Sequence, residues 1–310
     1  MATPAGSALL VCAGTGLFGT IGTARALGPE DAAASAITLV RLAMAITLMW
    51  VLLALTRREG LSRALRSRPV WAAGVAQAAF QVCFLGAVTR VGVATGTLVA
   101  IGATPLLTGL VQAVRTRRLS GTWALATGSG LAGLLLLVGP AIGSAAGVGT
   151  VPSTDTGIAS ETDAIGLLLA LGSAAAYATY ITLAGHVGTH GLTPTVALPV
   201  IFTVAAAVQL PAIALADWAW LGTASGRWMV VYLALVPTVL AYALFNRGLA
   251  GIDAATAATL GLVEPVVATL LAVLVLDERF TAVQAVGALL VGAGVLLAAR
   301  AGTAAPVSDP

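Results

Sequence analysis

The stretch GLVEPVVATLLAVLVLDERFTAVQAVGALLVGAGVLLAA, residues 261–299, decides the fold of this chain. It contains two long apolar runs, separated by the short charged turn Asp277-Glu278-Arg279. A helix that crosses a bilayer needs about 20 mainly apolar residues, which the second run supplies by itself and the first supplies when it is extended back to residue 254. The stretch therefore predicts two membrane helices joined by a turn, with one carboxylate, Glu264, inside the first helix.

The rest of the chain follows the same pattern. Of its 310 residues, 59% are hydrophobic and only 9% are charged. Soluble domains are about 45–50% apolar and about 25% charged, so a soluble fold is excluded, and so is a disordered chain. We predict an all-α membrane protein with ten transmembrane helices. Their expected limits are 6–24, 33–55, 70–89, 92–114, 121–140, 164–184, 194–216, 228–247, 254–276 and 281–300.

The arginines predict the orientation. They gather in the loops that follow helices 33–55 and 92–114, whereas the 141–163 loop contains neither Lys nor Arg. Loops rich in Lys and Arg face the cytoplasm. The loop arginines are Arg57, Arg58, Arg63, Arg66, Arg68, Arg115, Arg117 and Arg118. The expected location is the cytoplasmic membrane, with both termini in the cytoplasm.

The two ends of the chain show an internal repeat. Pro105 aligns with Pro265 and Phe18 with Tyr177, at offsets near 160 residues. Two five-helix halves follow, at 6–140 and 164–300, with an extracytoplasmic linker at 141–163 and a cytoplasmic tail at 301–310. Because five is odd, the second half enters from the opposite side, and such inverted repeats are typical of transporters.

The stretch 261–299 resembles the C-terminal half of EamA-type proteins of the drug/metabolite transporter superfamily. LVRLAMAITLM (39–49) resembles the second helix of that family. ALGSAAAYATYITLAGHVGTHGLTPTVAL (170–198) is similar to its amino-acid (threonine/homoserine) exporters. The resemblance implies ten helices in two repeats, a central cavity, and export or exchange of small metabolites.

Glu264 is the first candidate functional residue. An ionised carboxylate inside a membrane is costly, so this side chain should be protonated, paired or exposed to water. One interpretation makes it a proton-coupling or substrate-amine site that lines the cavity. The other makes it a protonated acid that donates to the Gly261 carbonyl, which Pro265 leaves without its usual partner.

Further substrate or coupling candidates are Thr104, Pro105, Pro265 and Arg41. The prolines should loosen their helices near the midplane, where repeat transporters place their binding sites, although packing without function remains open. Arg41 lies early in helix 33–55. It either snorkels toward the outer interface or pairs with a substrate carboxylate or Glu264.

Polar and aromatic side chains at helical spacing predict the cavity wall. A single such residue can also simply bond to a neighbouring helix, but stripes from both halves favour a shared aqueous cavity. The predicted wall residues are Phe18, Gln77, Gln81, Phe84, Thr108, Tyr177, Tyr180, Thr238, Tyr242 and Asn246.

We therefore predict a secondary active transporter, most simply an exporter, of a small polar or amphipathic metabolite such as an amino acid. An uptake permease of the same fold, coupled to protons, is the main alternative; a non-transporting subunit and an intramembrane enzyme are distant ones. His186 and His190 have a possible metal-ligand spacing but read as loop residues. No enzyme activity, cofactor, metal or nucleic-acid partner is expected. The bilayer and a small-molecule substrate are the expected partners, and a monomer and a homodimer both remain open.

Overall fold

The structure is a computed structural model that describes residues 3–30, 32–56, 59–117, 120–145, 164–210, 218–277 and 279–304. Within these ranges the regular structure is entirely helical. The helices are α1 (Pro4–Phe18), α2 (Thr20–Ala26), α3 (Ala34–Leu55), α4 (Leu61–Arg66), α5 (Arg68–Thr116), α6 (Gly121–Ala145), α7 (Ala164–Thr189), α8 (Pro194–Gln209), η2 (Ala219–Gly222), α9 (Ala224–Ala234), η3 (Leu235–Leu240), α10 (Ala241–Leu249), α11 (Ala254–Leu260), α12 (Val263–Val275) and α13 (Ala282–Ala304).

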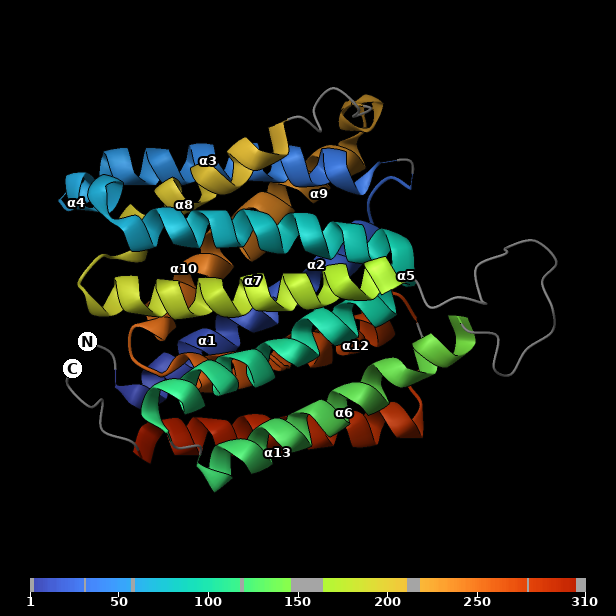
Figure 1. Ribbon diagram of the computed structural model, residues 1–310. Helices are drawn as coiled ribbons and strands as arrows, with labels where there is room; N and C mark the ends of the chain where they lie inside the picture. The colour runs from blue at the N-terminus through green and yellow to red at the C-terminus, as the bar shows by residue number, and fades with distance from the viewer. Residues whose placement is uncertain are drawn as a thin grey trace.

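This is an all-helical membrane protein. Over the described residues, eight helical segments are long and apolar enough to cross a bilayer, and α8 is a shorter apolar helix. The longest segment, α5, turns back on itself at Gly92, where φ is 80° and ψ is 162°. Gly92 supplies this backbone conformation, which side chains with a Cβ rarely adopt. The two limbs of α5 meet at this turn, with α7 drawn between them (Figure 1), and correspond to the predicted helices 70–89 and 92–114.

The helices form a bundle with two distinct ends. Figure 1 shows the start of α1 and the end of α13 at the same end of the bundle as the short helix α4. The turn of α5 at Gly92 lies at the opposite end. We call these the α4 end and the Gly92 end.

Three predicted helices are interrupted rather than continuous. The predicted helix 6–24 is divided at Gly19 into α1 and α2, and 254–276 is divided at Gly261-Leu262 into α11 and α12. The predicted helix 228–247 becomes α9, the π-helical segment η3 and α10. Pro237 lies inside η3 and has no N–H to donate, which favours a local departure from α-helical bonding.

Three helices continue beyond their predicted ends. Helix α7 runs to Thr189 and not to 184, so the prediction of His186 as a loop residue was wrong, whereas His190 lies in the turn that follows. Helix α6 runs to Ala145, into the segment predicted to be a linker from 141, and α13 runs to Ala304, past the predicted start of the tail. Residues 141–145 and 301–304 contain no proline, so each can supply its backbone N–H to the continuing helix. The rest of the predicted linker, the end of the predicted helix 194–216 and residues 305–310 lie outside the described ranges.

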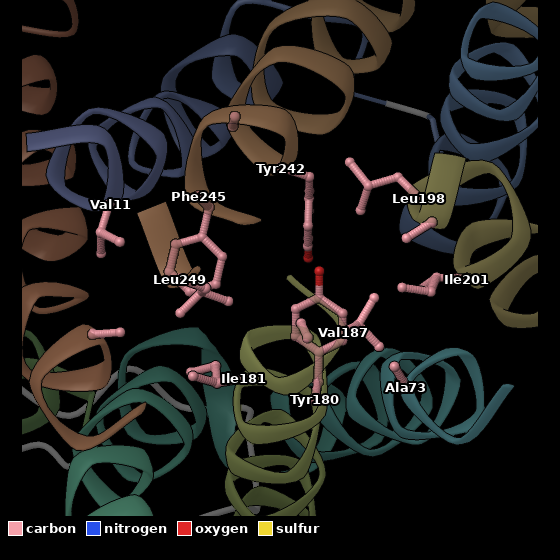
Figure 2. Packing of buried hydrophobic residues seen from close by; sticks show 14 of the residues in the cluster. Val11, Ala73, Tyr180, Ile181, Val187, Leu198, Ile201, Tyr242, Phe245 and Leu249 are labelled. Atoms are coloured by element: carbon pink, nitrogen blue, oxygen red, sulfur yellow. The ribbon is translucent and has the colours of Figure 1, made fainter. Parts of the chain in front are cut away.

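The α4 half of the bundle is filled by a hydrophobic cluster. Figure 2 shows Tyr180 and Tyr242 at its centre, with their hydroxyl groups turned toward each other. Leu249, Val187 and Ile201 are fully or almost fully buried around them. This packing closes the interior of the bundle toward the α4 end.

Helices α6 and α13 pack closely through small residues at one side of the bundle (Figure 1). A Cβ on Gly133 would lie 2.5 Å from the Gly287 carbonyl oxygen, so the two backbones are nearly in contact. The Ser129 hydroxyl donates to the Leu290 carbonyl across this seam, at 2.9 Å. The last helix of each predicted half is thus fastened to its counterpart.

Candidate substrate cavity

A cavity of about 310 Å³ lies between the helices, in the Gly92 half of the bundle. Its rim includes Arg25, Ala34, Val88 and Gln209, each near a helix end on that side. The other residues that line it are Phe18, Ile21, Ile37, Thr38, Arg41, Gln77, Phe80, Gln81, Phe84, Leu85, Ala100, Ile101, Tyr177, Phe202, Leu233, Pro237, Thr238, Tyr242 and Glu264. Helices from both halves of the chain therefore contribute to one chamber.

Aromatic rings form much of the wall. The Phe80 ring stacks on Tyr177 with 4.7 Å between centroids, and on Phe84 with 5.8 Å. On the other side, Phe18 packs against Tyr242 at 4.8 Å. Such rings present apolar faces to a ligand and attract cations through their π-systems. The wall suits an amphipathic molecule better than a strongly hydrated one.

Three amide side chains supply neutral polar contacts. The Gln77 amide nitrogen donates to the Tyr242 hydroxyl at 2.8 Å, and the Gln209 amide nitrogen donates to Gln81 Oε1 at 3.4 Å. Gln77 Oε1 and Gln81 Nε2 are buried without a partner in the structure. Buried polar atoms are nearly always hydrogen-bonded. An acceptor and a donor are thus available to a molecule in the cavity.

Arg41 provides a positive charge. It is half-buried in α3, lines the cavity, and its Nε is a buried donor with no partner. Arg41 and Glu264 line the same cavity. Both interpretations of Arg41, as an interfacial residue and as a partner of a carboxylate, stay predictions.

Glu264 contributes a carboxyl group to the lining, from the first turn of α12. The Gly261 carbonyl already accepts the Glu264 backbone N–H at 3.1 Å. The carbonyl predicted to lack a partner therefore has one from the backbone of Glu264 itself, and the role of the side chain as a second donor to it stays a prediction.

Gly19 fixes the position of Glu264. A Cβ on Gly19 would lie 2.6 Å from the Glu264 carbonyl oxygen and 3.0 Å from the Ala268 nitrogen. Only glycine allows the chain between α1 and α2 to pass this close to α12. The backbone that carries the carboxylate is thus held by direct contact with the first half of the chain.

The structure brings nine of the predicted site residues together in the cavity lining. These are Phe18, Arg41, Gln77, Gln81, Phe84, Tyr177, Thr238, Tyr242 and Glu264. The other six lie outside the lining: Thr104, Pro105, Thr108, Tyr180, Asn246 and Pro265.

The residues outside the lining have local partners. The Thr104 hydroxyl donates to the Ala100 carbonyl at 2.7 Å, and the Thr108 hydroxyl to the Thr104 carbonyl at 3.0 Å. Both threonines are buried against their own helix. Asn246 Nδ2 donates to the Tyr180 hydroxyl at 2.7 Å, in the cluster that closes the α4 end. Tyr180 and Asn246 therefore form part of the floor beneath the cavity.

Sequence reasoning missed several lining residues. Phe80 lies on the same helical face as Gln77 and Phe84, so its spacing could have identified it. Arg25 fell just beyond the predicted end of its helix. Its guanidinium donates to the Pro29 and Ala32 carbonyls, both at 2.6 Å, which secures the loop at the rim.

A bundle of membrane helices around a chamber that is lined by Arg41 and Glu264 and closed at one end is the arrangement expected of small-molecule transporters. Residues 164–300 match the EamA-like transporter family. Over 286 residues the chain is 33% identical to "Uncharacterized transporter YwfM" of Bacillus subtilis (strain 168), an overlap covering 92% of this chain and 90% of that protein. The chain belongs to the EamA-like transporter family and is a multi-pass membrane transporter, not an enzyme.

A solved structure titled "Crystal structure of protein" has the same fold, with a TM-score of 0.74. The match covers 96% of this chain and 97% of that one, at 22% sequence identity. At this identity the likeness shows the fold alone.

Proposed function

We propose that this protein is a secondary active transporter that exports a small amphipathic metabolite carrying both an amine and a carboxylate, such as an amino acid. One observation carries the proposal. Arg41 and Glu264 line the same aromatic-walled cavity, and buried polar atoms there lack partners. A carboxylate fits the guanidinium, an amine fits Glu264, and an apolar side chain fits the rings.

The orientation follows from the arginines at the α4 end, among them Arg63, Arg66 and Arg68. The positive-inside rule places this end in the cytoplasm of a bacterial-type cell membrane, together with both termini. The two limbs of α5 and the short helix α8 bring the crossings to the expected ten. The cavity then opens to the outside, and the cluster around Tyr180 closes the cytoplasmic side.

Transport in this proposal uses alternating access between two inverted halves. In the outward-open arrangement described here, substrate leaves from the cavity and Glu264 becomes accessible to external protons. Protonation of Glu264 releases the substrate amine and makes the return of the empty carrier less costly, because a neutral acid is more easily buried than a carboxylate. Glu264 thereby couples proton entry to substrate exit.

Reconstitution of Glu264→Gln in liposomes tests the coupling role. Transport of a library of labelled metabolites is measured with and without an imposed proton gradient. We expect the variant to lose gradient-driven transport and its pH dependence. Glu30→Gln is the matched control, because Glu30 is exposed in a loop and lies outside the cavity lining.

Wild-type rates and pH dependence in Glu264→Gln would contradict the proposal. The sign of the proton gradient that drives net movement separates an exporter from an uptake permease. Wild-type protein that moves none of the metabolites in either direction would favour a non-transporting subunit.

Arg41→Gln tests the carboxylate contact. A charge-assisted hydrogen bond contributes about 1.5–3 kcal/mol, so we expect transport of the carboxylate-bearing substrate to fall about tenfold to a hundredfold. The corresponding amine without a carboxylate should be transported equally by variant and wild type. Equal losses for both compounds would show that Arg41 supports the structure and not substrate recognition.

A further inference from the structure

A second pocket, of about 520 Å³, lies at the α4 end and has no part in the transport cavity. Nine described residues line it, and they include no Asp or Glu. Its polar side chains come from Ser62, Arg63, Arg66, Ser67, His186 and His190. Because the lining offers cations and neutral donors, the pocket suits an anion.

Several features direct hydrogen-bond donors toward this pocket. Arg63 Nη2 donates to the Gly191 carbonyl at 3.1 Å, which uses one of the five N–H donors of a guanidinium. Ser67 is the N-cap of α5 and makes no side-chain capping bond, so its hydroxyl lies at the positive end of a long helix. His190 Nδ1 lies 2.8 Å from the His186 carbonyl, which can only accept, so a proton on Nδ1 is used within this turn and is not offered to the pocket.

The nearby end of α7 does not oppose an anion, because its last carbonyls are occupied. The His186 carbonyl accepts the His190 N–H, the Gly188 carbonyl accepts the Gly191 N–H, and the Val187 carbonyl accepts the Leu192 N–H. A helix C-terminus with free carbonyls would repel negative charge. Here the turn at Gly191, with φ of 79°, folds the chain back over them.

Apolar side chains beside the pocket place it at the boundary between water and hydrocarbon. Leu65 on α4 is 45% exposed, and Trp71 on the first turns of α5 is 47% exposed. The Trp71 indole N–H donates to the Leu65 carbonyl at 2.8 Å. Tryptophan is enriched at this depth of a bilayer, and basic pockets between helices on the cytoplasmic side hold anionic lipid headgroups.

We propose that this pocket, between α4 and the turn that joins α7 to α8, binds the phosphate-bearing headgroup of an anionic phospholipid of the cytoplasmic leaflet. Its lining comes from both halves of the chain: α4 and α5 from the first, α7 and the following turn from the second. A bound headgroup holds the halves together where they are closed. This last consequence, but not the binding itself, rests on the proposed alternating access.

Native mass spectrometry of the purified full-length protein with dioleoylphosphatidylglycerol or dioleoylphosphatidylcholine tests the site. We expect the wild type to prefer phosphatidylglycerol, and Arg63→Gln combined with Arg66→Gln to bind it about thirtyfold more weakly, the loss expected for two basic residues near an anionic surface. Arg247→Gln combined with Arg300→Gln is the control, since both are exposed arginines outside the pocket.

No preference for phosphatidylglycerol in the wild type would overturn the proposal without any variant. So would equal losses in the pocket and control variants, which would indicate net charge alone. Displacement of phosphatidylglycerol by inorganic phosphate at equal concentration would make a soluble anion, not a lipid, the occupant.

Spin labels at Leu65→Cys and Thr189→Cys, with Cys12 and Cys83 replaced by alanine, report on the closed side. Neither labelled residue lines the pocket. Phosphatidylglycerol in nanodiscs should increase the share of the short label distance, relative to phosphatidylcholine. If the protein binds phosphatidylglycerol but the distribution of label distances does not change, the headgroup does not hold the two halves together. If the protein transports none of the metabolites in proteoliposomes, the proposed function is wrong, but the lipid binding measured by mass spectrometry still stands.

Discussion

Two proline-containing segments occupy equivalent positions in the two halves, but they differ in structure. Thr104-Pro105 lies inside the second limb of α5, which stays helical through the proline. Glu264-Pro265 follows an interruption at Gly261-Leu262, between α11 and α12. Only the second segment contributes its pre-proline side chain to the cavity.

The residue before each proline accounts for the difference. Threonine can bond back to its own helix, and Thr104 does so through the Ala100 carbonyl. A glutamate has no such use for its carboxyl group and needs water, a partner or a helix N-terminus. The interruption before α12 gives Glu264 access to the cavity. The proline alone does not make a site.

Thr104→Glu should have the largest effect, because it places a carboxylate where no cavity exists. Thr104 is 2% exposed and its surroundings are packed, so we expect a loss of about 3 kcal/mol or more of stability. Thermal unfolding in detergent measures the change. Thr104→Val, which loses only the local hydrogen bond, should stay within about 1 kcal/mol of wild type. Wild-type stability in Thr104→Glu would mean that this segment also reaches water.

Glu264→Thr gives the second segment the residue of the first. We expect transport to fall about tenfold to a hundredfold, the loss of one charge-assisted contact, while the protein remains folded. Initial rates in proteoliposomes measure this. Adding Thr104→Glu to the same protein should not restore transport. Recovery in the double variant would show that the two segments are interchangeable.

Gly19→Ala tests how firmly the second segment is held. The new methyl group would meet the Glu264 carbonyl at 2.6 Å, so α12 must shift, at a cost of about 1–3 kcal/mol. Gly22→Ala is the control, because a Cβ there has nothing within 4 Å. Unfolding temperatures and transport rates should fall for the first variant alone. Similar values for both variants would mean that the contact with α12 is easily relieved.

Replacing the prolines themselves should have the smallest effect. Pro105→Ala restores an N–H in an already helical segment, so stability should change by less than about 1 kcal/mol, with little change in transport rate. Pro265→Ala lets α11 and α12 join more regularly, which would move Glu264 and slow transport more. Initial transport rates of the two variants measure these effects. A larger loss for Pro105→Ala than for Pro265→Ala would contradict the prediction.

The sequence predicted the faces of the helices well. Gln77, Gln81 and Phe84 repeat at helical spacing and do line the cavity. Composition alone was sufficient to predict an all-helical membrane protein, because no soluble core could bury so many apolar residues. Glu264 stood out for the same reason, since a carboxylate inside an apolar helix requires an explanation.

The sequence could not predict how far along the bundle axis each side chain lies, and therefore which side chains reach the cavity. Tyr177 and Tyr180 share a helical face, but Tyr177 lines the cavity whereas Tyr180 lies in the floor beneath it. Asn246 lies one helical turn beyond Tyr242 and is likewise in the floor. Periodicity gives the direction of a side chain and not the level at which packing stops. The close approach of Gly19 to α12 at Glu264 and Ala268 is likewise brought about only by the folded chain.

The seam between α6 and α13 limits how the protein can move. At Gly133 and Gly287 the two backbones leave no room to slide past each other, and Ser129 adds a hydrogen bond across the line of contact. A pair of bodies joined along one edge can turn about that edge but cannot separate there. In the proposed alternating access the seam would therefore act as a pivot, and the largest displacements would belong to the helices farthest from it, among them α3 and α8 (Figure 1).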